Sequence, residues 1–397
     1  VSLVNTNVHF FDGTYNANVT GTEFKLANKE NTYQIDGQAA LSQQYQDNNT
    51  FGHKYSVELS KTSGNFRFEL GQNTESDTYD PNDLGYLRNN NEFSQNLELA
   101  YNIYEPFSVF LSFYNNLDLE FSSLYKPRKY QRFEVRWFSV GHFKNQSELG
   151  IFMNWQPESN DFFEPRIDDW NWKFKRPQHT YVNVWGSTDN SKDVSFSGSF
   201  SYMRAGRYDQ NMYQIGVHPS IRFSDQLSME YDLNYSSNVN DVGYVSDDYF
   251  NDGELPVIFG RRDVQTFTNT VESSFKFTNR MLLNLRVRHY WRSLDYKSFY
   301  QLQQDGYMSA PINYSVSEKD QANMNYNAFT VYLQYLWHFA PGSQLSLVWK
   351  NNIYTSSEEI PQGYFINLNN TLSSPQINSF SVKFIYYLDY QQIRGVF

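Results

Sequence analysis

One stretch near the C-terminus, Ala328 to Ile353, constrains the fold more than any other part of the sequence. On its first arm every second residue is apolar: Phe329, Val331, Leu333, Tyr335, Trp337 and Phe339. The residues between them are mostly polar, an Ala340-Pro341-Gly342-Ser343 turn follows, and the return arm alternates again through Leu345, Leu347 and Trp349. Alternation in two arms around a Pro-Gly turn predicts a β-hairpin.

The same alternation recurs along the chain. Phe133, Val135 and Trp137 alternate with charged residues, Leu283, Leu285 and Val287 alternate with polar ones, and similar segments run from Leu227 to Tyr235 and from Phe380 to Tyr390. Because successive side chains of a strand point to opposite faces, each strand has one apolar and one polar face. Large aromatic residues on the apolar face are typical of a transmembrane β-barrel with aromatic girdles.

The composition agrees with strands that cross a membrane and excludes several other classes. Aromatic residues make up 18% of the 397 residues, although the mean hydropathy is only −0.67. No run approaches the roughly 20 consecutive apolar residues of a membrane helix, whereas a barrel needs only alternate ones. The absence of cysteine excludes disulfides and Cys-metal sites, and the net charge of −11 argues against a nucleic-acid partner.

Short and long connections alternate between the expected strands. Short turns are expected at 27–31, 61–65, 104–108, 142–146, 188–193, 223–226, 278–281 and 340–343, and longer connections at 76–92, 120–129, 157–177, 239–263, 295–323 and 356–375. Outer-membrane barrels have short periplasmic turns and long extracellular loops. The sequence therefore predicts one all-β domain over 1–397, a closed antiparallel barrel of about 18 strands (roughly 16 to 20) in a bacterial outer membrane.

Four segments resemble one known family: Phe329 to Trp349, Phe259 to Leu285, Asp77 to Arg88 and Thr22 to Tyr45. They resemble outer-membrane proteins of Bacteroidota, a Gram-negative group, that join an N-terminal family-nine-type carbohydrate-binding module to a C-terminal β-barrel domain of unknown function. The resemblance covers nearly the whole chain. It implies that this chain is the barrel half, that a carbohydrate-binding module precedes it, and that this half supplies no catalytic residues.

Ten charged residues are expected to face the barrel lumen. They are Arg67, Glu69, Glu98, Arg132, Glu134, Arg136, Glu230, Asp232, Arg286 and Arg288. Charges of this kind set ion selectivity or contact ligands in pores. The alternative is a structural network of ion pairs, because barrel interiors are generally polar and both signs are interleaved here.

Two loops and two tryptophans carry further hypotheses. Trp170 and Trp172 lie in the Pro157 to Pro177 connection among carboxylates and predict either a saccharide contact or a small loop core. The acidic stretch Asp241 to Glu254 has enough oxygen ligands for a calcium ion, but it does not follow the EF-hand spacing and acidic loops are usually solvated, so no metal site is predicted. Trp337 and Trp349 are expected to anchor the membrane interface at the side of the Pro-Gly turn.

No motif indicates an enzyme. The sequence has neither a Gly-x-Ser-x-Gly elbow nor a His-Glu-x-x-His helix, and His289 on an apolar face is expected to be an interfacial anchor. We therefore predict no catalytic residue and no cofactor in this chain.

Three functions remain open: a porin-like conduit linked to saccharide uptake, a non-transporting anchor or subunit of a larger outer-membrane complex, and the barrel half of a carbohydrate-active enzyme. The expected partners are the lipid bilayer with its lipopolysaccharide, a saccharide, and other outer-membrane proteins. A soluble β-rich binding protein is a further class, against which the aromatic faces argue.

Overall fold

The computed structural model is built around one antiparallel sheet of 18 strands. It describes residues 1–11, 15–46, 48–167, 169–246, 257–314, 323–361 and 363–388. The strands of the first half are β1 (Ser2–His9), β2 (Asn16–Ala27), β3 (Tyr33–Tyr45), β4 (Thr50–Lys61), β5 (Phe66–Glu75), β6 (Glu92–Ile103), β7 (Phe110–Leu124), β8 (Tyr130–Phe143) and β9 (Glu148–Gln156).

The second half continues the same sheet. Its strands are β12 (His179–Ser187), β13 (Val194–Ala205), β14 (Asn211–Arg222), β15 (Leu227–Ser246), β16 (Ile258–Thr278), β17 (Met281–Gln301), β18 (Met324–Ala340), β19 (Ser343–Ser357) and β20 (Ile377–Ile385). Each strand pairs with the next along the chain, and β9 pairs with β12 across a long connection. The predicted all-β class, antiparallel pairing and strand number are confirmed.

The hairpin predicted from Ala328 to Ile353 is formed by β18 and β19. Leu333 lies opposite Trp349 and Phe329 lies opposite Ile353, so the two apolar arms share one face. Gly342 in the turn has a φ of +69°, a left-handed conformation that favours glycine. A Cβ atom at this position would also lie only 3.0 Å from the Cβ of Tyr387.

All eight predicted short turns lie between consecutive strands at one end of the sheet. The predicted connection 239–263 was too long, because β15 continues to Ser246 and β16 already begins at Ile258. Irregularities between Asn238 and Asp241 and between Tyr244 and Ser246 shift the register there. A bulge interrupts the period of two, so the sequence pattern loses its strand signal at this point.

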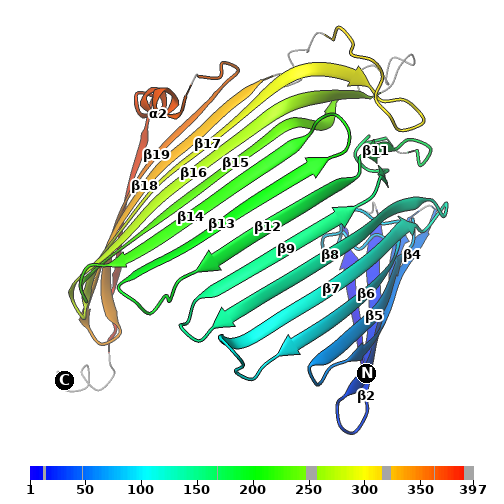
Figure 1. Cartoon of the computed structure of the whole chain (residues 1–397), viewed down its shortest axis with the longest axis horizontal. Coiled ribbons are helices and arrows are strands. Elements are labelled where there is room, and N and C mark those ends of the chain that lie inside the picture. The colour runs from blue at the N-terminus through cyan, green and yellow to red at the C-terminus, as the bar shows by residue number, and fades with distance from the viewer. Residues whose placement is uncertain are drawn as a thin grey trace.

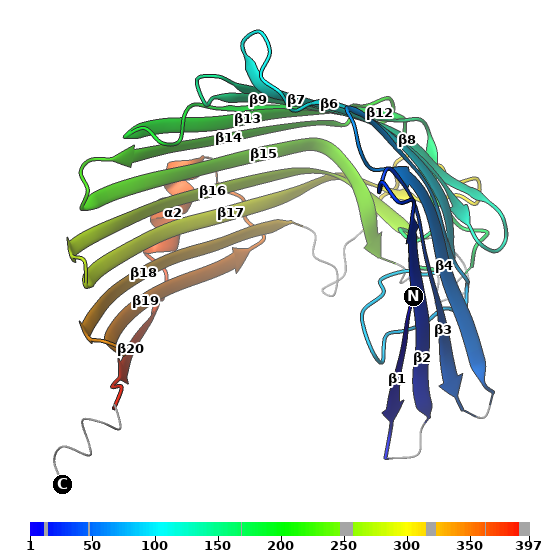
Figure 2. The ribbon, with the colours of Figure 1, turned by 90° about the horizontal axis from the view of Figure 1, so that it is seen from below.

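The sheet curls into an open C, with β1 and β20 along its two free edges (Figure 2). Within the described residues, β1 pairs only with β2 and β20 pairs only with β19. The pairings of the described residues therefore do not close the sheet into the predicted barrel. No helix in the described part of the chain is long and apolar enough to cross a membrane.

A short helix that the sequence did not predict, α2 (Tyr364–Leu372), packs on the apolar face of the sheet. The hydroxyl of Tyr364 lies 2.9 Å from Asn269 Nδ2 and 2.9 Å from His289 Nδ1, on the face that also carries Leu285 and Val287. Figure 1 shows α2 on the outer side of β18 and β19. The apolar face is therefore convex, and the polar face lines the inside of the curve.

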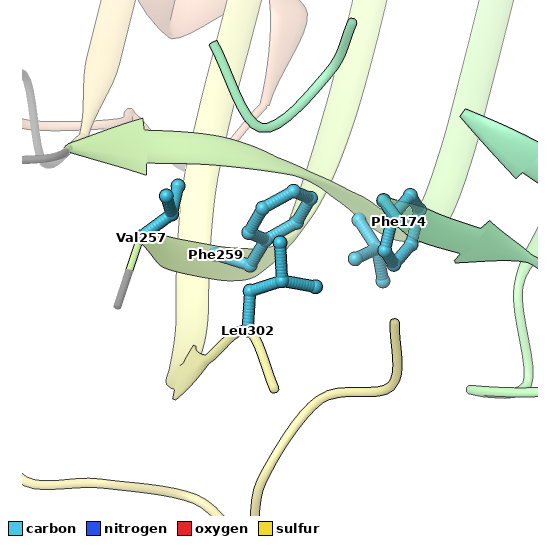
Figure 3. Packing of buried hydrophobic residues seen from close by; sticks show 5 residues of the cluster. Phe174, Val257, Phe259 and Leu302 are labelled. Atoms are coloured by element: carbon cyan, nitrogen blue, oxygen red, sulfur yellow. The ribbon is translucent and has the colours of Figure 1, made fainter. Parts of the chain in front are cut away.

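The long connections build a small core of their own at the opposite end from the short turns. Phe174, Val242, Val257, Phe259 and Leu302 are buried together (Figure 3). Phe174 belongs to β11 (Phe174–Arg176), which pairs with β10 (Ser159–Asp161) as a separate two-stranded sheet. The rings of Phe174 and Phe259 are 4.8 Å apart, so the 157–177 connection is fixed onto the ends of β15 and β16.

Candidate functional site

The strand register places the ten predicted lumen charges on one face of the sheet. Glu69 lies opposite Glu98, which lies opposite Asp118, which lies opposite Arg136. In the second half, Glu230 lies opposite Glu272, and Glu272 lies opposite Arg286. These residues belong to the concave face. Six of the ten fall into two groups on it: Arg132, Glu134 and Arg136 in the first, and Glu230, Arg286 and Arg288 in the second. The other four lie outside both groups; Arg67 donates to the Gly64 carbonyl at 3.2 Å, Asp232 pairs with His218 at 2.6 Å, and Glu69 and Glu98 face each other on β5 and β6.

The first group is a network of ion pairs on β7 and β8. Glu120 accepts hydrogen bonds of 2.7 Å from both Arg132 and Arg136. Arg136 also pairs with Asp118 at 3.1 Å, and both guanidinium groups lie within 3.7 Å of Glu134. The Glu120 side chain is only 16% exposed. The charges of this group therefore satisfy one another and leave little capacity for a ligand.

The second group lines a groove of about 650 Å³ that crosses β15 to β19. Its cations are Arg286, Arg288 and Lys350, all of them exposed. Arg286 Nε pairs with Glu272 at 3.0 Å. For Arg288 and Lys350, the described residues offer no carboxylate oxygen within 4.0 Å. Lys350 Nζ instead lies 5.4 Å from the centroid of the Tyr332 ring.

The groove is ordered in rows that run across the strands. Arg286, Tyr332 and Lys350 form one row, and Arg288, Thr330 and Asn352 form the next. Neutral hydrogen-bonding side chains lie at its margins, among them Ser228, Asn284 and Gln334. On β15 and β16 the first row continues into two carboxylates, Glu230 and Glu272. This arrangement provides positive charge, amide and hydroxyl groups, and one phenol ring on a single surface.

A third polar cluster lies outside the main sheet, where three connections meet. Glu158 pairs with Arg207 at 2.7 Å, and Tyr307 donates a 3.1 Å hydrogen bond to the same carboxylate. Lys175 lies 3.6 Å from Glu158 and donates to the Tyr307 hydroxyl at 3.0 Å. Burial opposes ionisation of Glu158, but the hydrogen bonds and the nearby positive charges outweigh it and lower the pKa of this carboxyl.

The two loop tryptophans do not form a joint stacking surface. Trp172 packs against the small core of Phe174 and Phe259, and Trp170 contacts Phe163 edge-to-face at 5.6 Å. The neighbouring carboxylates Asp161 and Glu164 are paired with Arg176, and Asp168 lies outside the described residues. These contacts agree with a small loop core, which was one of the two predictions for the 157–177 connection.

His289 is buried rather than exposed as an interfacial anchor, with 3% of its surface accessible. Its Nε2 lies 3.3 Å from Asn327, which also exchanges hydrogen bonds with Asn367 of α2. The sequence could not show this, because α2 covers the histidine. Among the described residues, no three His, Cys, Asp or Glu side chains are arranged to hold a metal. Part of Asp241 to Glu254 lies outside them.

Trp337 and Trp349 lie at different heights on the hairpin. Trp337 is opposite Leu345, close to the turn, and its ring contacts Phe339 at 5.6 Å. Trp349 is opposite Leu333, about 20 Å along β19 from the turn, and donates a 3.0 Å hydrogen bond to Asn378. Trp349 therefore lies away from the turn along the strand, and the interfacial role of the two tryptophans stays a prediction.

A family model for a domain of unknown function, DUF5916, matches residues 1–397. The chain belongs to the DUF5916 family. A search of curated proteins gave no match.

In this DUF5916 domain, several residues of the groove and of the third polar cluster could not be recognised from local sequence patterns. Lys350 and Tyr332 lie on the polar face of the predicted hairpin. The alternation of the sequence shows that they share this face, but it does not show that they line a groove. The pairing of Glu158 with Tyr307 joins residues 149 positions apart. No local pattern carries that information.

Proposed function

We propose that this DUF5916 domain forms the wall of an outer-membrane barrel that conducts hydrophilic solutes. The observation that carries the proposal is the separation of the two faces over one continuous sheet of 18 strands. On the convex face, Val57, Leu70 and Phe380 are 49%, 51% and 78% exposed. Apolar side chains exposed to this extent along a sheet are stable against lipid and costly against water.

Closure of the wall is part of the proposal. Backbone groups on an open edge in hydrocarbon cost several kcal/mol each, so β1 and β20 need partners in a membrane. β1 runs away from the short turns and β20 runs toward them, and the two strands have 8 and 9 residues. Their directions and lengths allow antiparallel pairing with each other.

A second candidate function is a subunit or anchor that transports nothing. The wide separation of β1 and β20 in Figure 2 favours it, because strands from another segment or another protein would fit between them. In this case the polar face would belong to a larger assembly. The resemblance to proteins of Bacteroidota leads us to propose a carbohydrate-binding module upstream, and with it a saccharide as the solute.

Insertion into lipid vesicles followed by single-channel recording tests these functions. A steady ohmic conductance supports the conduit, whereas insertion into a bilayer that stays sealed supports the anchor or subunit. A chain that remains monomeric in buffer without detergent would contradict both.

Two adjacent residues of β5 provide a matched control for membrane insertion. Leu70 is on the convex face and Glu69 is on the concave face, so Leu70→Lys and Glu69→Lys place the same charge on opposite sides. We expect Leu70→Lys to destabilise the inserted state by about 2–4 kcal/mol and Glu69→Lys to have a much smaller effect. Equal effects in vesicle-insertion assays would remove the lipid-facing assignment.

A further inference from the structure

We infer that the groove across β15 to β19 binds an acidic oligosaccharide, that is, a chain of hydroxyl-rich rings bearing carboxylates. This inference deepens the proposed conduit and rests on it, because the groove lies on the inner wall. Its basis is the set of cations on β17 and β19, of which Arg288 and Lys350 have no carboxylate partner among the described residues, together with the neutral polar side chains near them. The two carboxylates of the groove, Glu230 and Glu272, lie on its β15 and β16 side.

The cations define the charge of the ligand. Arg288 and Lys350 are exposed, and no carboxylate oxygen of the described residues lies within 4.0 Å of either group. Arg286 is held by Glu272 through Nε, which leaves its terminal nitrogens for a further acceptor. A guanidinium group presents a planar fork of donors that matches a carboxylate.

The spacing of the cations favours an extended ligand over a single small anion. Residues two apart on a strand are about 7 Å apart, which separates Arg286 from Arg288. Lys350 lies two strands away from Arg286 in the same row, at about 10 Å. The whole groove crosses five strands, or roughly 19 Å. A compact sulfate or phosphate ion covers only part of this surface, whose cations lie on β17 and β19 and whose β15 and β16 side carries Glu230 and Glu272.

The neutral lining matches hydroxyl groups. Asn284, Gln334 and Asn352 offer amides that both donate and accept, and Ser228 and Thr330 offer hydroxyls. Tyr332 stands between Arg286 and Lys350 in the central row and adds a ring. A neutral saccharide would leave the cations unsatisfied, whereas an acidic peptide would not use the many small hydroxyl and amide partners.

Isothermal titration of the detergent-solubilised protein at low salt tests the inference, with trigalacturonic acid as the probe and maltotriose as the neutral control. We expect trigalacturonic acid to bind and maltotriose to bind at least about tenfold more weakly. The double variant Arg288→Gln, Lys350→Gln is expected to lose about tenfold or more in affinity. Lys383→Gln, on the same face of β20 but outside the groove, is expected to change nothing.

Arg288→Lys keeps the charge but loses the planar fork of donors, and it is expected to bind more tightly than the Arg288→Gln, Lys350→Gln double variant, which separates loss of charge from misfolding. Equal binding of maltotriose, equal binding of inorganic sulfate, no measurable binding of trigalacturonic acid, or unchanged affinity in the double variant would each overturn the inference. Binding in micelles needs no pore, so a failed conductance experiment and a failed titration are distinguishable.

Discussion

The concave face carries two groups of charges that follow the same strand rule and reach opposite results. On β7 and β8, Arg136 lies across from Asp118, whereas Arg132 lies across from Ser122 and reaches Glu120 diagonally. Glu120 accepts hydrogen bonds from both arginines. On β17 and β19, Arg288 and Lys350 lie across from neutral residues such as Thr330 and Tyr332. Carboxylates within reach on the next strand, directly opposite or diagonal, therefore decide whether a cation of this face is paired or left without a carboxylate partner.

The largest effect on this comparison is expected from Glu120→Gln. The substitution leaves two partly buried guanidinium groups with weaker acceptors and should destabilise the fold by about 1–3 kcal/mol. Urea unfolding in detergent measures it. Glu272→Gln is the matched variant in the groove, where the Glu272 side chain is 50% exposed, and it should cost less than about 1 kcal/mol. Equal losses would erase the distinction between the two groups.

Charge reversal in the groove should change ion selectivity in planar bilayers. We expect Arg286→Glu with Arg288→Glu to shift the reversal potential toward cation preference, because both side chains are exposed on the concave face, the inner side of the proposed conduit. Lys383→Glu, on the same face of β20, should shift it less. An unchanged reversal potential in the double variant would show that these arginines do not face a conducting path.

The smallest expected effect concerns the third polar cluster, formed by Glu158, Arg207, Lys175 and Tyr307 outside the main sheet. It is a reference for both charge groups of the concave face. The lowered pKa of Glu158 means that its ionised form stabilises the folded state. This contribution is present at neutral pH and is lost as the pH falls through the lowered value, below about pH 4.3. The carboxylate is partly exposed, so the loss should stay under about 1 kcal/mol.

Thermal melts of the wild type and Glu158→Gln between pH 7 and pH 3 measure this contribution. We expect the two curves to differ at pH 7 and to converge in acid. A difference that persists or grows at pH 3 would contradict the assignment.

Much of the fold could be predicted from the sequence because its signal is local. Alternation in steps of two and tight turns such as Pro341-Gly342 depend on neighbouring residues, and they predicted the hairpin of β18 and β19, the short turns and the number of strands. The errors came where the local signal stops. Register shifts near Asn238 and Tyr244 hid the ends of β15 and β16, and a polar connection hid α2.

The sequence by itself determined which residues share a face, because side-chain direction along a strand is fixed by the backbone. Only the tertiary structure decided which charges have partners. Glu120 meets Arg132 and Arg136 through the register of β7 and β8, while Lys350 meets Tyr332 and His289 is covered by Tyr364. These contacts depend on the alignment of strands and on a helix that folds back over the sheet, and no spacing along one strand specifies either.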